Sequence, residues 1–172
     1  MRKIRYVVAM SLDGYIAGPN GEANWIGTDP EVDFLALWSQ FDTLLMGRKT
    51  YEAAAKRLGE KMFAGVASIV FSRTMKAQCH PGVTIISELT ADWVKALKNQ
   101  SGKDIWLFGG SDLFRAFLDS GYVDSIEVSV IPVLLGDGIS LLPPPYSPAK
   151  LSLTSHKVYR SGRLSLAYQV KY

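Results

Sequence analysis

The chain has 172 residues, 48% hydrophobic and 20% charged, and this length and composition predict one domain over residues 1–172 with a sizeable core. The Lys and Arg residues behind the formal net charge of +3 are scattered rather than gathered in a stripe, which argues against a nucleic-acid partner. The single cysteine, Cys79, excludes an intramolecular disulfide framework and a cysteine-rich zinc site, so we expect no metal and a reducing, cytoplasmic setting. The apolar run 6–10 is too short for a signal segment, and we expect no membrane span.

The first elements are a strand and a glycine-rich loop. Residues 4–10 are apolar and β-branched, which predicts a strand. Asp13 follows it, and this residue either caps its own turn or lies at the carboxyl end of a central strand, where open α/β sheets bind ligands. The loop that begins at Gly18 and runs to Trp25 is either a mobile lid over a site or an ordinary surface connection.

A helix is predicted from Thr28 to near Asp42. A capping residue, an early proline and carboxylates in the first turn are typical of a helix start, and apolar residues follow at helical spacing. Glu31 and Asp33 are the carboxylates of interest here. They either complement the helix dipole or bind a ligand.

Two further strands end in groups suited to phosphate. Strand 43–46 is followed by Gly47, Arg48, Lys49 and Thr50, which open a helix through residue 58. Cations at a helix N-terminus oppose the helix dipole, so a bound phosphate would explain them, and a solvated basic turn is the alternative. Strand 68–71 repeats the arrangement, with Ser72 and Arg73 after it.

A glycine pair lies between the next strand and helix. Residues 105–108 predict a strand buried on both faces, and the residues after Ser111 are apolar at helical spacing. Gly109 and Gly110 let the backbone bend sharply and let an outside group approach the N–H groups of the helix N-terminus. This is either a phosphate site or a plain turn.

The remaining pattern completes a fold prediction. Residues 83–86 and 125–133 predict strands, residues 90–97 a helix, and residues 151–159 and 163–172 an antiparallel hairpin. The alternation of strands and helices predicts an α/β, three-layer αβα fold with a mixed, mostly parallel sheet. A nucleotide would lie across the carboxyl edge of that sheet.

Four ordered motifs resemble those of the dihydrofolate reductase superfamily. They are Ala-Met-Ser-Leu-Asp-Gly-Tyr-Ile-Ala at 9–17, Leu-Met-Gly-Arg-Lys-Thr-Tyr-Glu at 45–52, Val-Phe-Ser-Arg at 70–73 and Phe-Gly-Gly at 108–110. Ser-Leu-Asp-Gly at 11–14 and Ile-Pro-Val-Leu-Leu-Gly-Asp-Gly at 131–138 are more similar to the reductase domain of the bacterial bifunctional riboflavin-biosynthesis deaminase-reductase and its small stand-alone relatives.

The resemblance implies an NADPH-dependent reductase with a small heterocyclic substrate, and it makes a homodimer plausible. The guanidinium of Arg73, with Ser72, would bind the 2′-phosphate and favour NADPH over NADH. Asp13 would lie close to the reacting centre, as a substrate ligand or a proton relay. Trp25, in the loop that matches the family's mobile loop, would bind substrate. The other residues implied to bind cofactor are Ile16, Ala17, Gly47, Arg48, Lys49, Thr50, Phe108, Gly109, Gly110, Ser111 and Leu113.

The motifs do not determine the substrate. Glu31, or Asp33 one register away, matches the carboxylate that binds the pterin in the folate enzyme, but Val128 replaces that enzyme's late threonine. The region 32–41 holds no Arg, Lys or His to bind a phosphorylated pyrimidine, and the deaminase motifs are absent from the sequence. The sequence therefore predicts a reductase of the riboflavin-pathway type, reducing a phosphoribosylamino-uracil or a similar heterocycle. Dihydrofolate reduction and a non-catalytic NADPH-binding module are the alternatives.

Overall fold

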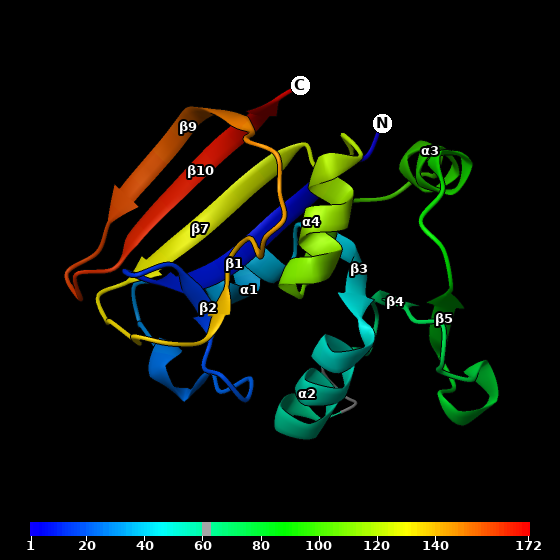
Figure 1. The fold of residues 1–172 in the computed structure, drawn as a ribbon, viewed down its shortest axis with the longest axis horizontal. Helices are drawn as coiled ribbons and strands as arrows, with labels where there is room; N and C mark the ends of the chain where they lie inside the picture. Colours follow the sequence, from blue (N-terminus) through cyan, green and yellow to red (C-terminus); the bar gives the residue numbers. More distant parts are fainter. Residues whose placement is uncertain (60–62) are drawn as a thin grey trace.

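The computed structural model describes residues 1–59 and 63–172. In this part of the chain the elements form one large eight-stranded sheet and a small two-stranded one (Figure 1). The strands of the large sheet, in spatial order, are β5 (Val83–Ile86), β4 (Ala67–Phe71), β3 (Phe41–Gly47), β6 (Asp104–Gly109), β1 (Ile4–Ser11), β7 (Ser125–Ile131), β10 (Leu164–Lys171) and β9 (Lys150–Val158).

The direction of the strands confirms the predicted mixed sheet. The six strands from β5 to β7 pair in parallel, while β10 pairs antiparallel with both β7 and β9. The hairpin of β9 and β10 is the predicted C-terminal hairpin, and it extends the sheet at one side (Figure 1). Because the six parallel strands share one direction, their carboxyl ends lie at one edge.

Side chains of successive strand residues divide the core between the two faces of the sheet. On β3, Leu45 belongs to the cluster on one face, while Leu44 and Met46 belong to the cluster on the other. On β6, Leu107 and Trp106 are divided in the same way. This alternation is the period of two expected for a strand covered on both faces.

Helices cover both faces and complete the three layers. Those on the first face are α3 (Ala91–Asn99) and α4 (Ser111–Asp119), and those on the second are α1 (Phe34–Trp38) and α2 (Arg48–Leu58). Helix α4 directs Phe114, Phe117 and Leu118 into the core, because residues three and four apart share one face of a helix. Helix α2 begins at Arg48, directly after Gly47, and so it includes the residues that the sequence assigned to its opening turn.

The predicted long helix from Thr28 to Asp42 is wrong. Only α1 forms there. It begins at Phe34, because the side chain of Asp33 caps it by accepting from the N–H of Ala36 at 2.8 Å. The helix stops at Trp38, and the buried Phe41 already begins β3. Residues 28–32 are held away from helical geometry by contacts with the C-terminal hairpin, described below.

The small sheet was not anticipated. It pairs β2 (Tyr15–Ala17) with β8 (Ile139–Ser140), and so it joins the chain after β1 to the chain after β7. At Gly138 any side chain would collide with the carbonyl of Ala17, which explains the glycine at this close approach. Over residues 1–59 and 63–172, no helix is long and apolar enough to cross a membrane.

Candidate functional site

The carboxyl ends of four neighbouring strands bring the predicted cofactor residues to one edge. In the order β4-β3-β6-β1, these strands end at Phe71, Gly47, Gly109 and Ser11. Gly47 is in register with Phe71, and Met46 is in register with Gly109, so the ends of β4, β3 and β6 are level. The structure therefore gathers the groups that follow these strands into one row.

Two helices begin at this edge, and their first turns meet. A Cβ atom on Gly110 would lie 3.2 Å from Oγ1 of Thr50, and one on Gly47 would lie 3.9 Å from the carbonyl oxygen of Gly109. Neither α2, capped by Gly47, nor α4, capped by Gly110, has a side-chain hydrogen bond at its N-cap. The N-terminal N–H groups of both helices are therefore left for other acceptors, and anions are the acceptors that a helix N-terminus favours.

The glycine pair gives this edge its shape. Gly109 has φ of +105°, a conformation that residues with a Cβ rarely adopt, and the peptide bond between Gly109 and Gly110 is cis. Tyr6 lies beneath the turn, with its Cε2 atom 3.7 Å from where a Cβ on Gly109 would be. Ser111, the first residue of α4, is buried.

The three cations at this edge differ in their pairing. Arg48 pairs with Glu52 one helical turn away at 3.0 Å, and both side chains are exposed. Lys49 and Arg73 are also exposed, and neither forms an ion pair with any residue that the structure describes. The hydroxyl of Ser72 accepts from the N–H groups of Thr74 at 3.2 Å and Met75 at 3.0 Å, so it orders the turn that carries Arg73.

Asp13 binds backbone groups across 122 residues of sequence. Its carboxylate accepts from the N–H of Gly136 at 2.7 Å, from the N–H of Leu135 at 3.1 Å and from the hydroxyl of Ser11 at 2.6 Å. These hydrogen bonds, that of Ser11 first, lower the pKa of Asp13, so the carboxylate is ionised at neutral pH. The lowered pKa makes the carboxylate a weaker proton acceptor, and its part in the reaction stays a prediction.

The loop after β2 is ordered by its own contacts. Ile16 and Ala17 are half-buried in the small sheet, beside the end of β1. Trp25 lies in the 3-10 turn η1 (Asn24–Ile26), and its indole Nε1 donates to the carbonyl of Glu22 at 3.0 Å. The 3-10 turn and the hydrogen bond of Trp25 to Glu22 thus fold this part of the loop onto itself.

The carboxylates predicted to bind substrate already have partners within the chain. Asp33 caps α1, and Glu31 accepts from the backbone N–H of Arg160 at 3.0 Å. Sequence reasoning missed their neighbour Asp29, whose side chain is 4% exposed beside Arg163. No local pattern marks this pair, because the two residues belong to segments far apart in the sequence.

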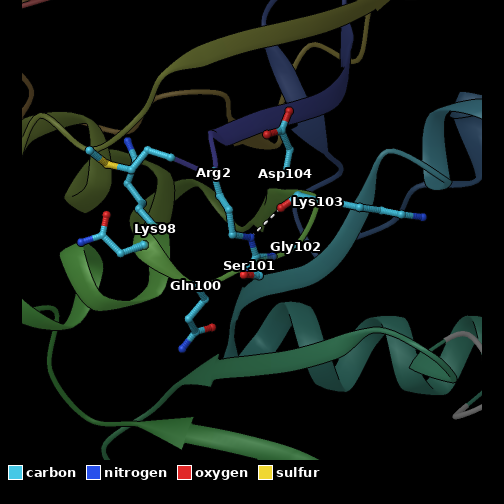
Figure 2. A pocket seen from close by; sticks show the side chains of 9 residues that line it. Arg2, Lys98, Gln100, Ser101, Gly102, Lys103 and Asp104 are labelled. Atoms are coloured by element: carbon cyan, nitrogen blue, oxygen red, sulfur yellow. Dashed lines mark hydrogen bonds between the residues drawn. The ribbon is translucent and has the colours of Figure 1, made fainter.

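Two hollows lie elsewhere on the molecule. One, of about 320 Å³, lies where β1 and β6 begin, at the amino edge of the sheet. Figure 2 shows the side chains that line it. Its Arg2 donates to the carbonyl of Lys103 at 2.5 Å and pairs with Asp42, and its Lys98 pairs with Asp124 at 2.7 Å. Because these cations are neutralised by the chain's own carboxylates, they form a structural network rather than a charged ligand site.

The second hollow, of about 450 Å³, lies between α4 and residues 141–151. It is lined almost wholly by apolar side chains, including Phe114, Val128, Leu142 and Leu166. Such a lining does not suit the phosphates of a nucleotide. Among the residues that the structure describes, no group of three or more His, Cys, Asp or Glu side chains could hold a metal ion.

Comparison with known proteins shows the family and the fold of the chain. The family described as "RibD C-terminal domain" matches residues 2–164. An uncharacterized protein of Bacillus subtilis, YyaP, is 32% identical over 97% of this chain and 94% of its own. The crystal structure of a putative riboflavin biosynthesis protein from Shewanella sp. PV-4 is 26% identical, covers all of both chains and superposes with a TM-score of 0.84.

Two more distant structures show the same fold. A deaminase and 5-amino-6-(5-phosphoribosylamino)uracil reductase of Thermotoga maritima is 20% identical and has a TM-score of 0.73 over 99% of this chain and 57% of its own. Dihydrofolate reductase of Enterococcus faecalis, solved with NADP(H), is 17% identical and has a TM-score of 0.70 over 99% of this chain and 97% of its own. The predicted fold of the dihydrofolate reductase type is confirmed.

Proposed function

Because the chain belongs to the RibD C-terminal domain family, we propose that it is an NADPH-dependent reductase of the riboflavin-biosynthesis type, acting on a pyrimidine-like or pterin-like heterocycle. The observation that supports this most is the junction of Gly47, Thr50 and Gly110. There two helix N-termini without side-chain caps meet at the carboxyl edge of a parallel sheet. Pyrophosphate is the kind of ligand that such an edge binds.

The residues at this edge fit NADPH. A side chain on Gly110 would press against Thr50, so the glycine keeps the backbone open to close approach by a ligand. In this proposal the N–H groups at the starts of α2 and α4 bind the pyrophosphate, with Gly47, Arg48, Lys49 and Thr50 on one side and Phe108, Gly109, Gly110, Ser111 and Leu113 on the other. The exposed guanidinium of Arg73, on a turn ordered by Ser72, binds the 2′-phosphate.

The chain's own residues orient the reactants. Bound NADPH supplies a hydride, and the protein supplies alignment and exclusion of water. Ile16 and Ala17 would line the nicotinamide, with the loop of Trp25 beyond them. Asp13, ionised and hydrogen-bonded to the backbone at residues 135–136, would fix the loop after β7 at the end of β1.

The contacts of the substrate-side carboxylates bear on the substrate. Recognition of a pterin by Glu31 would need its carboxylate free, but Glu31 accepts from the N–H of Arg160, and Asp33 caps α1. These contacts argue against dihydrofolate, while the family match is what supports a pyrimidine of the riboflavin pathway. The same family resemblance supports a homodimer, which sedimentation of the purified chain would test.

The test is NADPH consumption by the purified protein. The chain would be offered 5-amino-6-(5-phosphoribosylamino)uracil and dihydrofolate in parallel, and NADPH loss would be followed by absorbance. We expect oxidation with the uracil compound. Oxidation with dihydrofolate alone would identify the folate activity instead, and tight NADPH binding without oxidation in a wider panel of pyrimidines and pterins would favour a non-catalytic module.

A further inference from the structure

The loop between β2 and α1 is fastened to the turn of the C-terminal hairpin. The contact joins Asp29, in the middle of the loop, to Ser161 and Arg163, in or beside the turn. The hydroxyl of Ser161 donates to Oδ2 of Asp29 at 2.5 Å, and Nε of Arg163 lies 4.0 Å from the same oxygen. The side chains of Asp29 and Arg163 are only 4% and 11% exposed, so water screens this pair far less than a surface pair.

Each partner also binds backbone on the loop side. Arg163 donates from Nη2 to the carbonyl of Ile26 at 3.1 Å, and Oδ1 of Asp29 accepts from the N–H of Glu31 at 3.0 Å. A second ion pair, between Arg160 and Glu31, is 3.6 Å long with Arg160 95% exposed. Exposed pairs contribute little, so Asp29, Ser161 and Arg163 form the centre of the contact. We call these three residues the latch.

The hairpin turn that carries the latch is closed by two backbone hydrogen bonds. The N–H of Tyr159 donates to the carbonyl of Arg163 at 2.9 Å, and the N–H of Gly162 donates to that of Tyr159 at 3.0 Å. Gly162 has φ of +84°, and a Cβ atom placed on it would lie 3.5 Å from Cγ of Pro132. The latch therefore joins the loop to the large sheet through β10.

Asp29 is in the charged state that the latch needs. The hydroxyl of Ser161 is the largest cause that lowers its pKa, followed by the N–H of Glu31 and then by the charges of Arg163 and Lys157. The carboxylate is thus ionised at neutral pH and attracts the guanidinium.

The latched loop connects both halves of the proposed site. It leaves β2 directly after Ile16 and Ala17, passes Trp25 and ends at the Asp33 cap of α1. We propose that the latch sets the position of this loop for hydride transfer, and that Asp29 is a positioning residue of the reductase. This inference rests on the proposed function, since the loop matters to turnover only if the chain is a reductase.

Three variants and one control test the latch. Asp29→Ala removes the carboxylate, Ser161→Ala removes one donor, and the double variant removes both. Asp119→Ala, at the exposed end of α4, is the control, because Asp119 forms no hydrogen bond or ion pair through its side chain within the described part of the chain. For each protein we would measure hydrogen exchange of the amides at 18–33, NADPH affinity, kcat and KM.

We expect faster exchange at 18–33 in Asp29→Ala and a kcat lower by about tenfold to about 100-fold, as misplacement of a positioning element causes. The Ser161→Ala loss should be smaller, and the double variant should be no worse than Asp29→Ala, because both changes remove one shared hydrogen bond. NADPH affinity should change less than kcat, since β7 and β1 separate β10, beside the latch, from the ends of β6 and β3 that are proposed to bind pyrophosphate. Asp119→Ala should match the wild type.

Two results would overturn the inference in different ways. Unchanged exchange at 18–33 in Asp29→Ala would show that the latch does not hold the loop. Faster exchange with unchanged kcat would show that it holds the loop but does not position it for the reaction. If the wild type transfers no hydride to any substrate, the proposed function and the positioning role both fail, while the exchange data still decide whether the contact orders the loop.

Discussion

Tyr6 offers a test of the core that does not depend on any activity. Its side chain is completely buried in the middle of β1, with its ring stacked on Phe114 at a centroid distance of 3.8 Å and an interplanar angle of 7°. Its hydroxyl has no hydrogen-bond partner among residues 1–59 and 63–172. Burial accordingly raises the pKa of Tyr6 well above its ordinary value.

Tyr6→Phe should stabilise the protein. The substitution keeps the stacked ring and removes only the oxygen, so the stacking on Phe114 and the core volume hardly change. A buried polar group without a partner costs about 1–3 kcal/mol, and we expect the free energy of unfolding to rise by up to that amount. The assay is urea denaturation at neutral pH, read as a shift in midpoint at constant slope.

Tyr172→Phe is the matched control. The hydroxyl of Tyr172 accepts from the N–H of Val123 and donates to its carbonyl, both at 3.0 Å, so its removal should lower the free energy of unfolding by about 0.5–1 kcal/mol. If Tyr6→Phe were instead destabilising by more than about 1 kcal/mol, the reasoning would be refuted. The hydroxyl would then have a partner, such as a buried water molecule.

Three substitutions test the site. Arg73→Ala should weaken NADPH binding by about tenfold to about 100-fold and leave NADH binding nearly unchanged, and equal losses in titrations with both would remove the 2′-phosphate assignment. Gly110→Val should abolish NADPH binding in a folded chain, because its Cβ would already lie 3.2 Å from Thr50, and unchanged affinity with an unchanged circular dichroism spectrum would make the turn a plain one. Asp13→Asn should lower kcat more than NADPH affinity. Because the pKa of Asp13 is lowered in the folded state, its ionised form stabilises the protein above the ordinary pKa of 3.8, and this stabilisation is lost as the pH falls below that value. The free energy of unfolding of the variant should therefore fall less steeply with decreasing pH than that of the wild type.

The sequence was sufficient for those parts of the fold that depend on local pattern. Strands such as β3 and β6 are apolar on both faces, glycines mark their ends, and the turn at residues 160–162 separates two alternating runs. Each of these signals lies within a few residues of the element it predicts. The pairing of β2 with β8 has no such signal, because each strand is three residues or shorter and its partner is remote.

The predicted helix from Thr28 failed for a related reason. Its first turn has the residues of a good helix start, but Asp29 binds Ser161, 132 residues away, and Glu31 binds the backbone of Arg160. These contacts replace the capping and dipole interactions that the pattern indicated. Local propensity cannot show a competitor that arrives only with the tertiary fold.

The two sides of the candidate site are built by different means, and this explains which residues could be identified in advance. The proposed cofactor side consists of backbone at Gly47 and Gly109–Gly110, so glycine itself is the signal. On the other side Asp13 and Asp29 each use a carboxylate to hold a distant segment of backbone or a hairpin turn. An acid that binds a ligand and an acid that binds a remote loop are the same letter in a sequence. Only the fold distinguishes them, and here it shows both carboxylates bound to groups more than 100 residues away in the sequence.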